Sequence, residues 1–153
     1  MPDPAAVQRL FTAACDLSPA ERAAFLAAQC GDDAALRAEV EALGRLQHPG
    51  IASILQAGTF RSAYGEQPCL AIELVHGEPL HALARRTRLD LPTRLAVLLE
   101  ICGAVHHAHQ QGLIHRDLKP GNVFVDRSNH AKVLDFGIAP GRRGRGPRAA
   151  TCC

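Results

Sequence analysis

The chain has 153 residues, of which 47% are hydrophobic and 21% are charged, so it fits one globular domain with its own core and is not disordered as a whole. Residues 141–153 hold four arginines and no acid, which leaves a net charge of −2 on residues 1–140 and argues against nucleic-acid binding. The start of the chain lacks the pattern of a signal peptide, and its most apolar stretch, 95–105, is too short to span a membrane.

The first third of the chain has the apolar spacing of helices. Residues 4–15 form the first expected helix. Ser18 and Glu21 are typical of a capping box and begin a second helix. Asp32 caps a third helix, which ends at the His-Pro-Gly sequence of residues 48–50.

Strands and two further helices are expected next. The apolar runs 51–55 and 69–75 predict an antiparallel hairpin with a long loop, because glycines and a proline separate them. A short helix at about 80–87 and a long helix from 92 to about 111 follow. The residues of the long helix that we expect to face the core are Leu95, Leu98, Leu99, Cys102 and Val105.

Two short strands complete the expected elements, at 122–125 and 131–134, and a polar turn joins them. Residues 140–153 are rich in arginine and glycine, which predicts a disordered tail. The six cysteines contain no Cys-x-x-Cys spacing, which favours reduced thiols and a cytoplasmic protein.

One stretch combines the residue types of a catalytic centre. It reads His115-Arg116-Asp117-Leu118-Lys119-Pro120-Gly121-Asn122, and Asp135-Phe136-Gly137 begins 13 residues after Asn122. The two segments resemble the catalytic loop and the metal-binding motif of eukaryotic-type protein kinases, in the form found in bacterial serine/threonine kinases. Acids and amides in turns often only cap backbone groups, but eleven matching positions in order favour the resemblance.

The resemblance implies a role for each polar residue of these segments. Asp117 would accept the proton of the substrate hydroxyl, and Lys119 would reach the transferred phosphate. Asn122 and Asp135 would hold Mg²⁺ through oxygen ligands. Arg116 would await a phosphorylated activation loop.

Other residues would support this site. The resemblance implies that Phe124 lies under the adenine ring of ATP. It also implies that His115 and Phe136 pack in the core that holds the catalytic loop, and that Gly137 is a further structural or regulatory residue.

Residues upstream extend the resemblance. Glu39 stands nine residues before the His-Pro pair, at the place of the family's third-helix glutamate, although a solvated helix glutamate is an equal alternative. Residues 72–80 resemble the hinge, in which Ile72 would be the gatekeeper and the backbones of Glu73 and Val75 would bind adenine. The alternative for the hinge is a buried strand followed by a turn.

The resemblance covers about residues 37–139 and lacks parts of a kinase domain. There is no Gly-x-Gly-x-x-Gly loop, and the only two lysines, Lys119 and Lys132, leave none to pair with Glu39 and hold the α- and β-phosphates. No activation segment follows the second motif. We therefore expect an α+β, kinase-like fold that is an incomplete two-lobe domain, with a partial small lobe and the front part of the helical lobe. Its expected parts are a helical leader at 1–31, the partial kinase domain at 32–139 and the tail at 140–153.

The resemblance implies a protein kinase that uses ATP and Mg²⁺ to phosphorylate a serine or threonine of a protein substrate, with turnover absent or very low in this chain. The alternative is an inactive, pseudokinase-like module that binds nucleotide or a protein. A gene relic with no folded role is a third hypothesis. Neither a nucleic-acid partner nor a membrane segment is expected.

Three smaller features leave alternatives open. The leader runs directly into the third-helix pattern, as if three strands had been lost. The tail has the composition of a changed reading frame or, alternatively, of a basic linker. The leader helices could bind a partner, although packing within the chain is favoured. His106, His107 and His109 with Cys102 could form a metal site, although a structural role is favoured.

Overall fold

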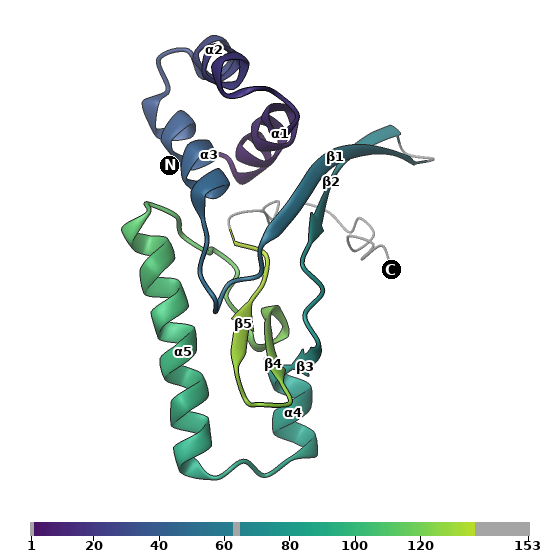
Figure 1. The fold of residues 1–153 in the computed structure, drawn as a ribbon, viewed down its shortest axis with the longest axis vertical. Helices are drawn as coiled ribbons and strands as arrows, with labels where there is room; N and C mark the ends of the chain where they lie inside the picture. The colour runs from purple at the N-terminus through teal and green to yellow at the C-terminus, as the bar shows by residue number, and fades with distance from the viewer. Residues whose placement is uncertain (1, 63–64, 137–153) are drawn as a thin grey trace.

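The computed structural model describes residues 2–62 and 65–136 of the chain. Its first three elements are helices that gather at one end of the molecule, namely α1 (Pro4–Cys15), α2 (Pro19–Cys30) and α3 (Ala34–Arg45) (Figure 1). Ser18 and Glu21 form the predicted capping box at the start of α2. Helix α3 is capped by Asp33 rather than by Asp32, since the Asp33 carboxylate accepts a 2.9 Å hydrogen bond from the Leu36 N–H.

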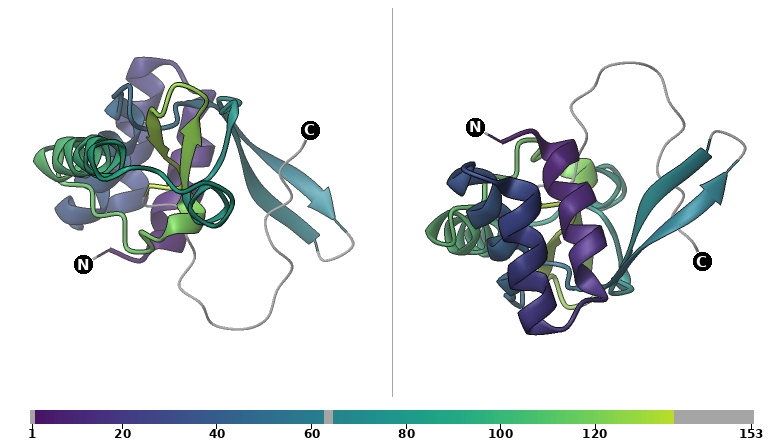
Figure 2. Two further views of the ribbon diagram at one scale, coloured as in Figure 1. Left: turned by 90° about the horizontal axis from the view of Figure 1, so that it is seen from below. Right: turned by 90° about the horizontal axis from the view of Figure 1, so that it is seen from above.

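The leader helices pack within the chain, as predicted. Helix α1 lies against α3 and against the strand that follows it, and α2 lies beside α1 (Figure 2). The buried apolar residues of this group are Val7, Phe11, Ala14, Leu26, Cys30, Val40, Ala42 and Leu43. Arg22 ties α2 to the end of α1, because its guanidinium donates hydrogen bonds of 3.0, 3.3 and 3.2 Å to the carbonyls of Ala14, Cys15 and Leu17.

A long antiparallel hairpin, β1 (Ile54–Ser62) and β2 (Gly65–Ile72), projects from the body of the molecule (Figure 2). Its register runs from Ile54 opposite Ile72 to Ser62 opposite Gly65. The loop predicted between the two apolar runs is therefore wrong, because that segment continues both strands. Both strands of a two-stranded sheet are edge strands, which is why the ladder tolerates a proline within β2.

The second sheet has three short antiparallel strands in the order β3 (Gly77–Pro79), β4 (Val123–Asp126) and β5 (Ala131–Val133). Around it lie α4 (Leu80–Arg86), the long helix α5 (Leu91–Gln110) and the 3₁₀ turn η1 (Pro120–Asn122) (Figure 1). Segment 50–52 runs beside β5, since the Ala52 N–H donates to the Val133 carbonyl at 2.9 Å and the Val133 N–H donates to the Gly50 carbonyl at 2.8 Å. This mixture of helices and small sheets is the predicted α+β class.

The predicted inner face of α5 is wrong. The residues that face the core are Val97, Ile101, Ala104 and Ala108, whereas Leu95, Leu98, Leu99 and Cys102 are exposed and Val105 is partly buried. The small side chain of Ala104 lets the chain at Gly50 approach the helix closely, since a Cβ at Gly50 would lie 3.2 Å from the Cβ of Ala104. Hydropathy alone favoured the leucine face, but nothing in the described part of the chain covers it. No helix among residues 2–62 and 65–136 is long and apolar enough to cross a membrane.

Candidate functional site

The first motif forms a loop between α5 and η1. Fully buried Leu113 anchors the start of this loop in the core. The Asn122 side chain reaches back across it, and its Nδ2 donates to the Asp117 carbonyl at 3.0 Å and to Asp117 Oδ2 at 3.3 Å. Lys119 Nζ contacts the same carboxylate oxygen. The structure therefore brings together three predicted site residues, Asp117, Lys119 and Asn122.

The second motif is joined to this loop by hydrogen bonds and ring packing. The Leu134 N–H donates to the Asn122 carbonyl at 2.8 Å. The His115 ring packs against the Phe136 ring at a centroid distance of 4.6 Å, and both side chains are buried. Asp135 lies in sequence between these two contact points, which tie its segment to the loop that carries Asp117 and Asn122. Gly137, the last predicted residue of the motif, lies outside the described residues.

Both motifs contain a residue in the left-handed region of backbone space. Arg116 has φ 63° and Asp135 has φ 62°, although neither is glycine. Such a conformation costs about 1–2 kcal/mol at an ordinary residue. Each is next to a buried aromatic ring, His115 beside Arg116 and Phe136 beside Asp135, and the packing of these rings offsets the cost.

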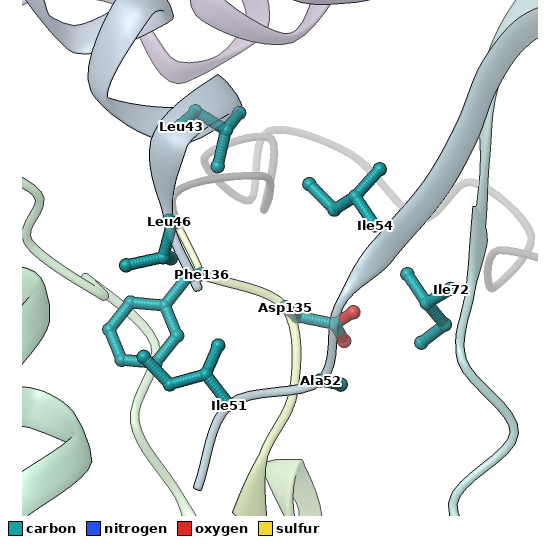
Figure 3. Close-up of a pocket in the computed structure, with 8 residues that line it drawn as sticks. All are labelled: Leu43, Leu46, Ile51, Ala52, Ile54, Ile72, Asp135 and Phe136. Carbon is teal, nitrogen blue, oxygen red and sulfur yellow. The ribbon is translucent and has the colours of Figure 1, made fainter. Parts of the chain in front are cut away.

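A small apolar pocket lies beside the second motif (Figure 3). It is lined by Leu43, Leu46, Ile51, Ala52, Ile54, Ile72, Asp135 and Phe136. The Phe136 ring lies on the side of Leu46 and Ile51, whereas the Asp135 carboxylate points away from that ring toward Ala52 (Figure 3). Among the described residues that line this pocket, Asp135 is the only charged one, and the others are apolar.

Asn122 and Asp135 offer the donors of the Mg²⁺ site that the resemblance implies. A carbonyl accepts only from the NH₂ end of an amide, so the bond to the Asp117 carbonyl leaves Oδ1 of Asn122 as an acceptor that points away from that carbonyl. Mg²⁺ takes oxygen ligands and keeps several waters, so this amide and the Asp135 carboxylate fit it. Within the described ranges no group of three or more His, Cys, Asp or Glu is placed to hold a metal.

The predicted hinge follows β2 and is fixed by Glu73. Its N–H donates to the Ser53 carbonyl at 2.9 Å, and its carboxylate accepts the Ser53 N–H at 3.0 Å and contacts Lys132. Burial alone would raise the pKa of Glu73, but the hydrogen bonds from Lys132 and Ser53 outweigh it and hold that pKa below its ordinary value. The Val75 carbonyl accepts the Gly77 N–H at 3.0 Å, while the Val75 N–H meets no acceptor among the described residues.

Strand β5 is joined to the hinge, because its Lys132 contacts Glu73. Phe124 is partly buried on β4 and lies opposite Lys132 of β5. Sequence reasoning missed the ion pair between Lys132 and the hinge. The register of β4 and β5 places Lys132 on the same face as Phe124, but no local sequence pattern indicates its pairing with Glu73.

Glu39 is not a solvated helix residue. Its side chain is 7% exposed, and both carboxylate oxygens lie within 2.9 Å of Nη2 of Arg116, at 2.7 and 2.9 Å. The ion pair joins α3 to the catalytic loop across 77 positions of sequence. Sequence reasoning missed this pair, because it assigned the two residues to different partners.

The predicted histidine cluster is divided among different neighbours. His107 packs against His48 at a ring distance of 5.0 Å, while His106 and His109 are exposed on other faces of α5. The contact between His107 and His48 packs α5 against the segment after α3.

Comparison with known proteins gives one matching family and a series of relatives. The family model described as "Protein kinase domain" matches residues 24–152. The serine/threonine-protein kinase PknA of Mycobacterium tuberculosis is 43% identical over 105 residues, which are 67% of this chain and 24% of the relative. The serine/threonine-protein kinase PknB of Mycolicibacterium smegmatis is 34% identical over 104 residues, which are 67% of this chain and 17% of the relative.

A third relative extends the range of organisms. The probable serine/threonine-protein kinase CE0033 of Corynebacterium efficiens is 34% identical over 104 residues, or 67% of this chain and 16% of the relative. The chain thus spans a quarter or less of the length of these curated relatives.

Proposed function

This chain belongs to the protein kinase domain family, and from that premise we propose that it binds magnesium-complexed ATP between its hinge and its catalytic loop. We further propose that transfer of the γ-phosphate to a serine or threonine of a protein substrate is absent or very slow. The relatives carry serine/threonine kinase names, but their chains extend far beyond the part matched here.

The observation that carries the proposal is the double attachment of Asn122. Its side chain binds Asp117, and its backbone carbonyl binds the N–H of Leu134 next to Asp135. Asn122 therefore joins the segment of Asp117 to the segment of Asp135, which supports a common nucleotide site for the proton acceptor and the two oxygen donors. An isolated acid in a turn would not have this arrangement.

Each residue would act in a defined way when nucleotide is bound. The Asp117 carboxylate would orient the substrate hydroxyl and accept its proton, and Lys119 beside it would balance the charge. Asn122 and Asp135 would hold Mg²⁺, which supplies charge neutralisation at the phosphate oxygens. The free Val75 N–H and the Glu73 carbonyl would bind the adenine edge, with Phe124 beneath the ring.

The positions of the two lysines support slow or absent transfer of phosphate. Lys132 is engaged by the hinge carboxylate of Glu73, and Lys119 by Asp117, so neither lysine is placed to pair with Glu39. Removal of one donor to a developing charge lowers kcat by about 10²–10³. The same observation favours the second candidate function, a nucleotide-binding module without transfer.

The test uses the full 153-residue chain in two assays. Calorimetric titration measures binding of Mg-ATP and of Mg-ADP, and radiolabelled ATP measures transfer to a generic serine/threonine substrate. We expect saturable Mg-ATP binding that Asp135→Asn weakens and that the control Asp32→Asn, an exposed carboxylate on the α2–α3 turn, leaves unchanged. Any trace of transfer should vanish in Asp117→Asn.

Two outcomes would overturn the proposal. A cooperatively folded chain that shows no saturable binding of Mg-ATP would remove the nucleotide site. Robust phosphorylation of the substrate by the unaltered chain would contradict impaired transfer.

A further inference from the structure

Glu39 and Arg116 form the least exposed ion pair among the described residues. Their side chains are 7% and 18% exposed, whereas the surface pair of Glu41 and Arg37 on the same helix is 35% and 44% exposed. A charge buried to this degree is costly without its partner. The two residues should therefore move together rather than separate.

Arg116 depends on Glu39 for its position. The guanidinium Nε and Nη1 are buried and find no hydrogen-bond partner among the described residues, so the carboxylate of Glu39 is what holds the group through Nη2. Arg116 is also in the left-handed region at φ 63°, a conformation that needs outside support. The ion pair from α3 gives the loop that support.

Arg116 is bonded directly to Asp117 in the chain. A shift of the Arg116 backbone out of the left-handed region would rotate the next peptide unit and redirect the Asp117 side chain away from Asn122. The seating of α3 is thus linked to the direction of the carboxylate through one ion pair and one peptide bond.

We propose that Glu39 is a positioning residue for the catalytic loop, acting through Arg116 on the orientation of Asp117. The proposal rests on the proposed function in one respect, namely that Asp117 is the residue that accepts the proton of the substrate hydroxyl. Glu39 pairs here with Arg116, because the sequence has no lysine to pair with it. The proposed role depends on the charge of Glu39 rather than on its size.

A merely structural role makes a different prediction. If the pair only holds α3 on the body, loss of charge at Glu39 lowers the stability of the whole chain, and all slow amides exchange faster together. If Glu39 positions the loop, exchange rises locally. The informative amides are those of Asp117, bonded to the His115 carbonyl, and Asn122, bonded to the Lys119 carbonyl.

The experiment is hydrogen exchange on the full chain without nucleotide, followed by titration with Mg-ATP. Variants are Glu39→Gln, the conservative Glu39→Asp and the double variant Glu39→Gln/Arg116→Gln. The matched control is Glu41→Gln, which removes a half-exposed carboxylate from the same helix. The double variant removes both charges and keeps the test usable if Glu39→Gln does not fold.

We expect Glu39→Gln to raise exchange at the Asp117 and Asn122 amides about tenfold or more, while the amides of β4 and β5 keep their rates. Glu39→Asp should restore part of the protection, and Glu41→Gln should resemble the unaltered chain. In the double variant, loop exchange should also rise while the sheet stays protected. Mg-ATP affinity should fall in step with loop exchange.

The inference is overturned if Glu39→Gln behaves as Glu41→Gln does, or if exchange rises equally in the loop and in the sheet. It is also overturned if the double variant keeps the loop as protected as in the unaltered chain. Failure of the unaltered chain to bind Mg-ATP would reject the proposed function instead, because exchange is measured without nucleotide.

Discussion

The Nε2 of His115 donates a 2.8 Å hydrogen bond to the carbonyl oxygen of Leu134, 19 residues further along the chain. Because a carbonyl only accepts, this bond fixes the proton of the imidazole on Nε2. The same ring packs against Phe136, so one buried side chain joins the two motif segments by a polar and an apolar contact. The relative position of Asp117 and Asp135 follows from this junction.

Replacement of His115 tests that junction. His115→Ala removes a buried ring and leaves the Leu134 carbonyl without its donor, so we expect the free energy of unfolding to fall by about 2–4 kcal/mol. Urea denaturation followed by circular dichroism measures the change. The control is His76→Ala, an exposed histidine beside the hinge, for which we expect little effect. Equal stability of the two variants would show that the contacts of His115 do not stabilise the fold.

Glycine at position 77 is required by the close approach of β3 to β4. A Cβ at Gly77 would lie 2.5 Å from the Val125 carbonyl oxygen, which would force the strands apart. We expect Gly77→Ala to lower the free energy of unfolding by about 1–3 kcal/mol. The matched control is Gly103→Ala in α5, where no atom lies within 4 Å and alanine should add about 0.5–1 kcal/mol. Thermal denaturation of both variants checks the opposite signs, and destabilisation by both would contradict the explanation.

Local signals predicted the site segments better than they predicted the fold around them. The two motifs, the capping box at Ser18 and the ends of α5 depend on neighbouring residues, and the structure has these features where the sequence placed them. The roles given to Asp117 and Asp135 remain predictions. What the structure adds is that hydrogen bonds of Asn122 join the two segments that carry them.

The features that sequence reasoning missed depend on long-range contacts. The pair of Glu39 and Arg116 spans 77 positions, and that of Lys132 and Glu73 spans 59, so no local pattern contains either. The leucine face of α5 has the stronger hydropathy, yet Ala104 and Ala108 are buried, and a Cβ at Gly50 would lie only 3.2 Å from the Cβ of Ala104. Packing distance decided that face, and hydropathy does not report packing distance.

The ion pair of Glu73 and Lys132 predicts a dependence of stability on acid pH. The pKa of Glu73 is lowered in the folded chain, so its contribution is present above the unfolded value of about 4.3 and is lost as pH falls through the folded value. Lys132→Met removes a partner that lowers this pKa and leaves only the hydrogen bonds from Ser53 to oppose burial, so the pKa of Glu73 rises. The loss of stability should then begin at a higher pH than in the unaltered chain.

Chemical denaturation between pH 3 and 7 measures this shift, with Glu73→Gln as the control. Glu73→Gln removes the titrating group, so the free energy of unfolding of this variant should lack the pH dependence that Glu73 contributes. Adding Lys132→Met to Glu73→Gln should not change that pH dependence further. A Lys132→Met curve parallel to that of the unaltered chain at all pH values would show that the pair does not set the ionisation of Glu73.

His48 predicts a second dependence, near neutral pH. Burial, with a smaller effect of His107, lowers the pKa of His48, and its Nδ1 accepts the Gly50 N–H at 3.0 Å, which requires the neutral ring at that atom. The unfolded histidine titrates at about 6.5. The free energy of unfolding should therefore fall as pH drops below that value, because the unfolded chain takes up a proton that the folded chain resists.

His130 opposes this slope and supplies the matched comparison. Its hydrogen bond with Glu100 raises the pKa of His130, so its contribution is present below the unfolded value and is lost as pH rises through the folded one. We expect His48→Gln to flatten the decline in unfolding free energy between pH 7.5 and 5.5, and His130→Gln to steepen it. Urea titrations at four pH values in that range separate the two effects. If both variants keep the slope of the unaltered chain, neither histidine is coupled to folding as its contacts require.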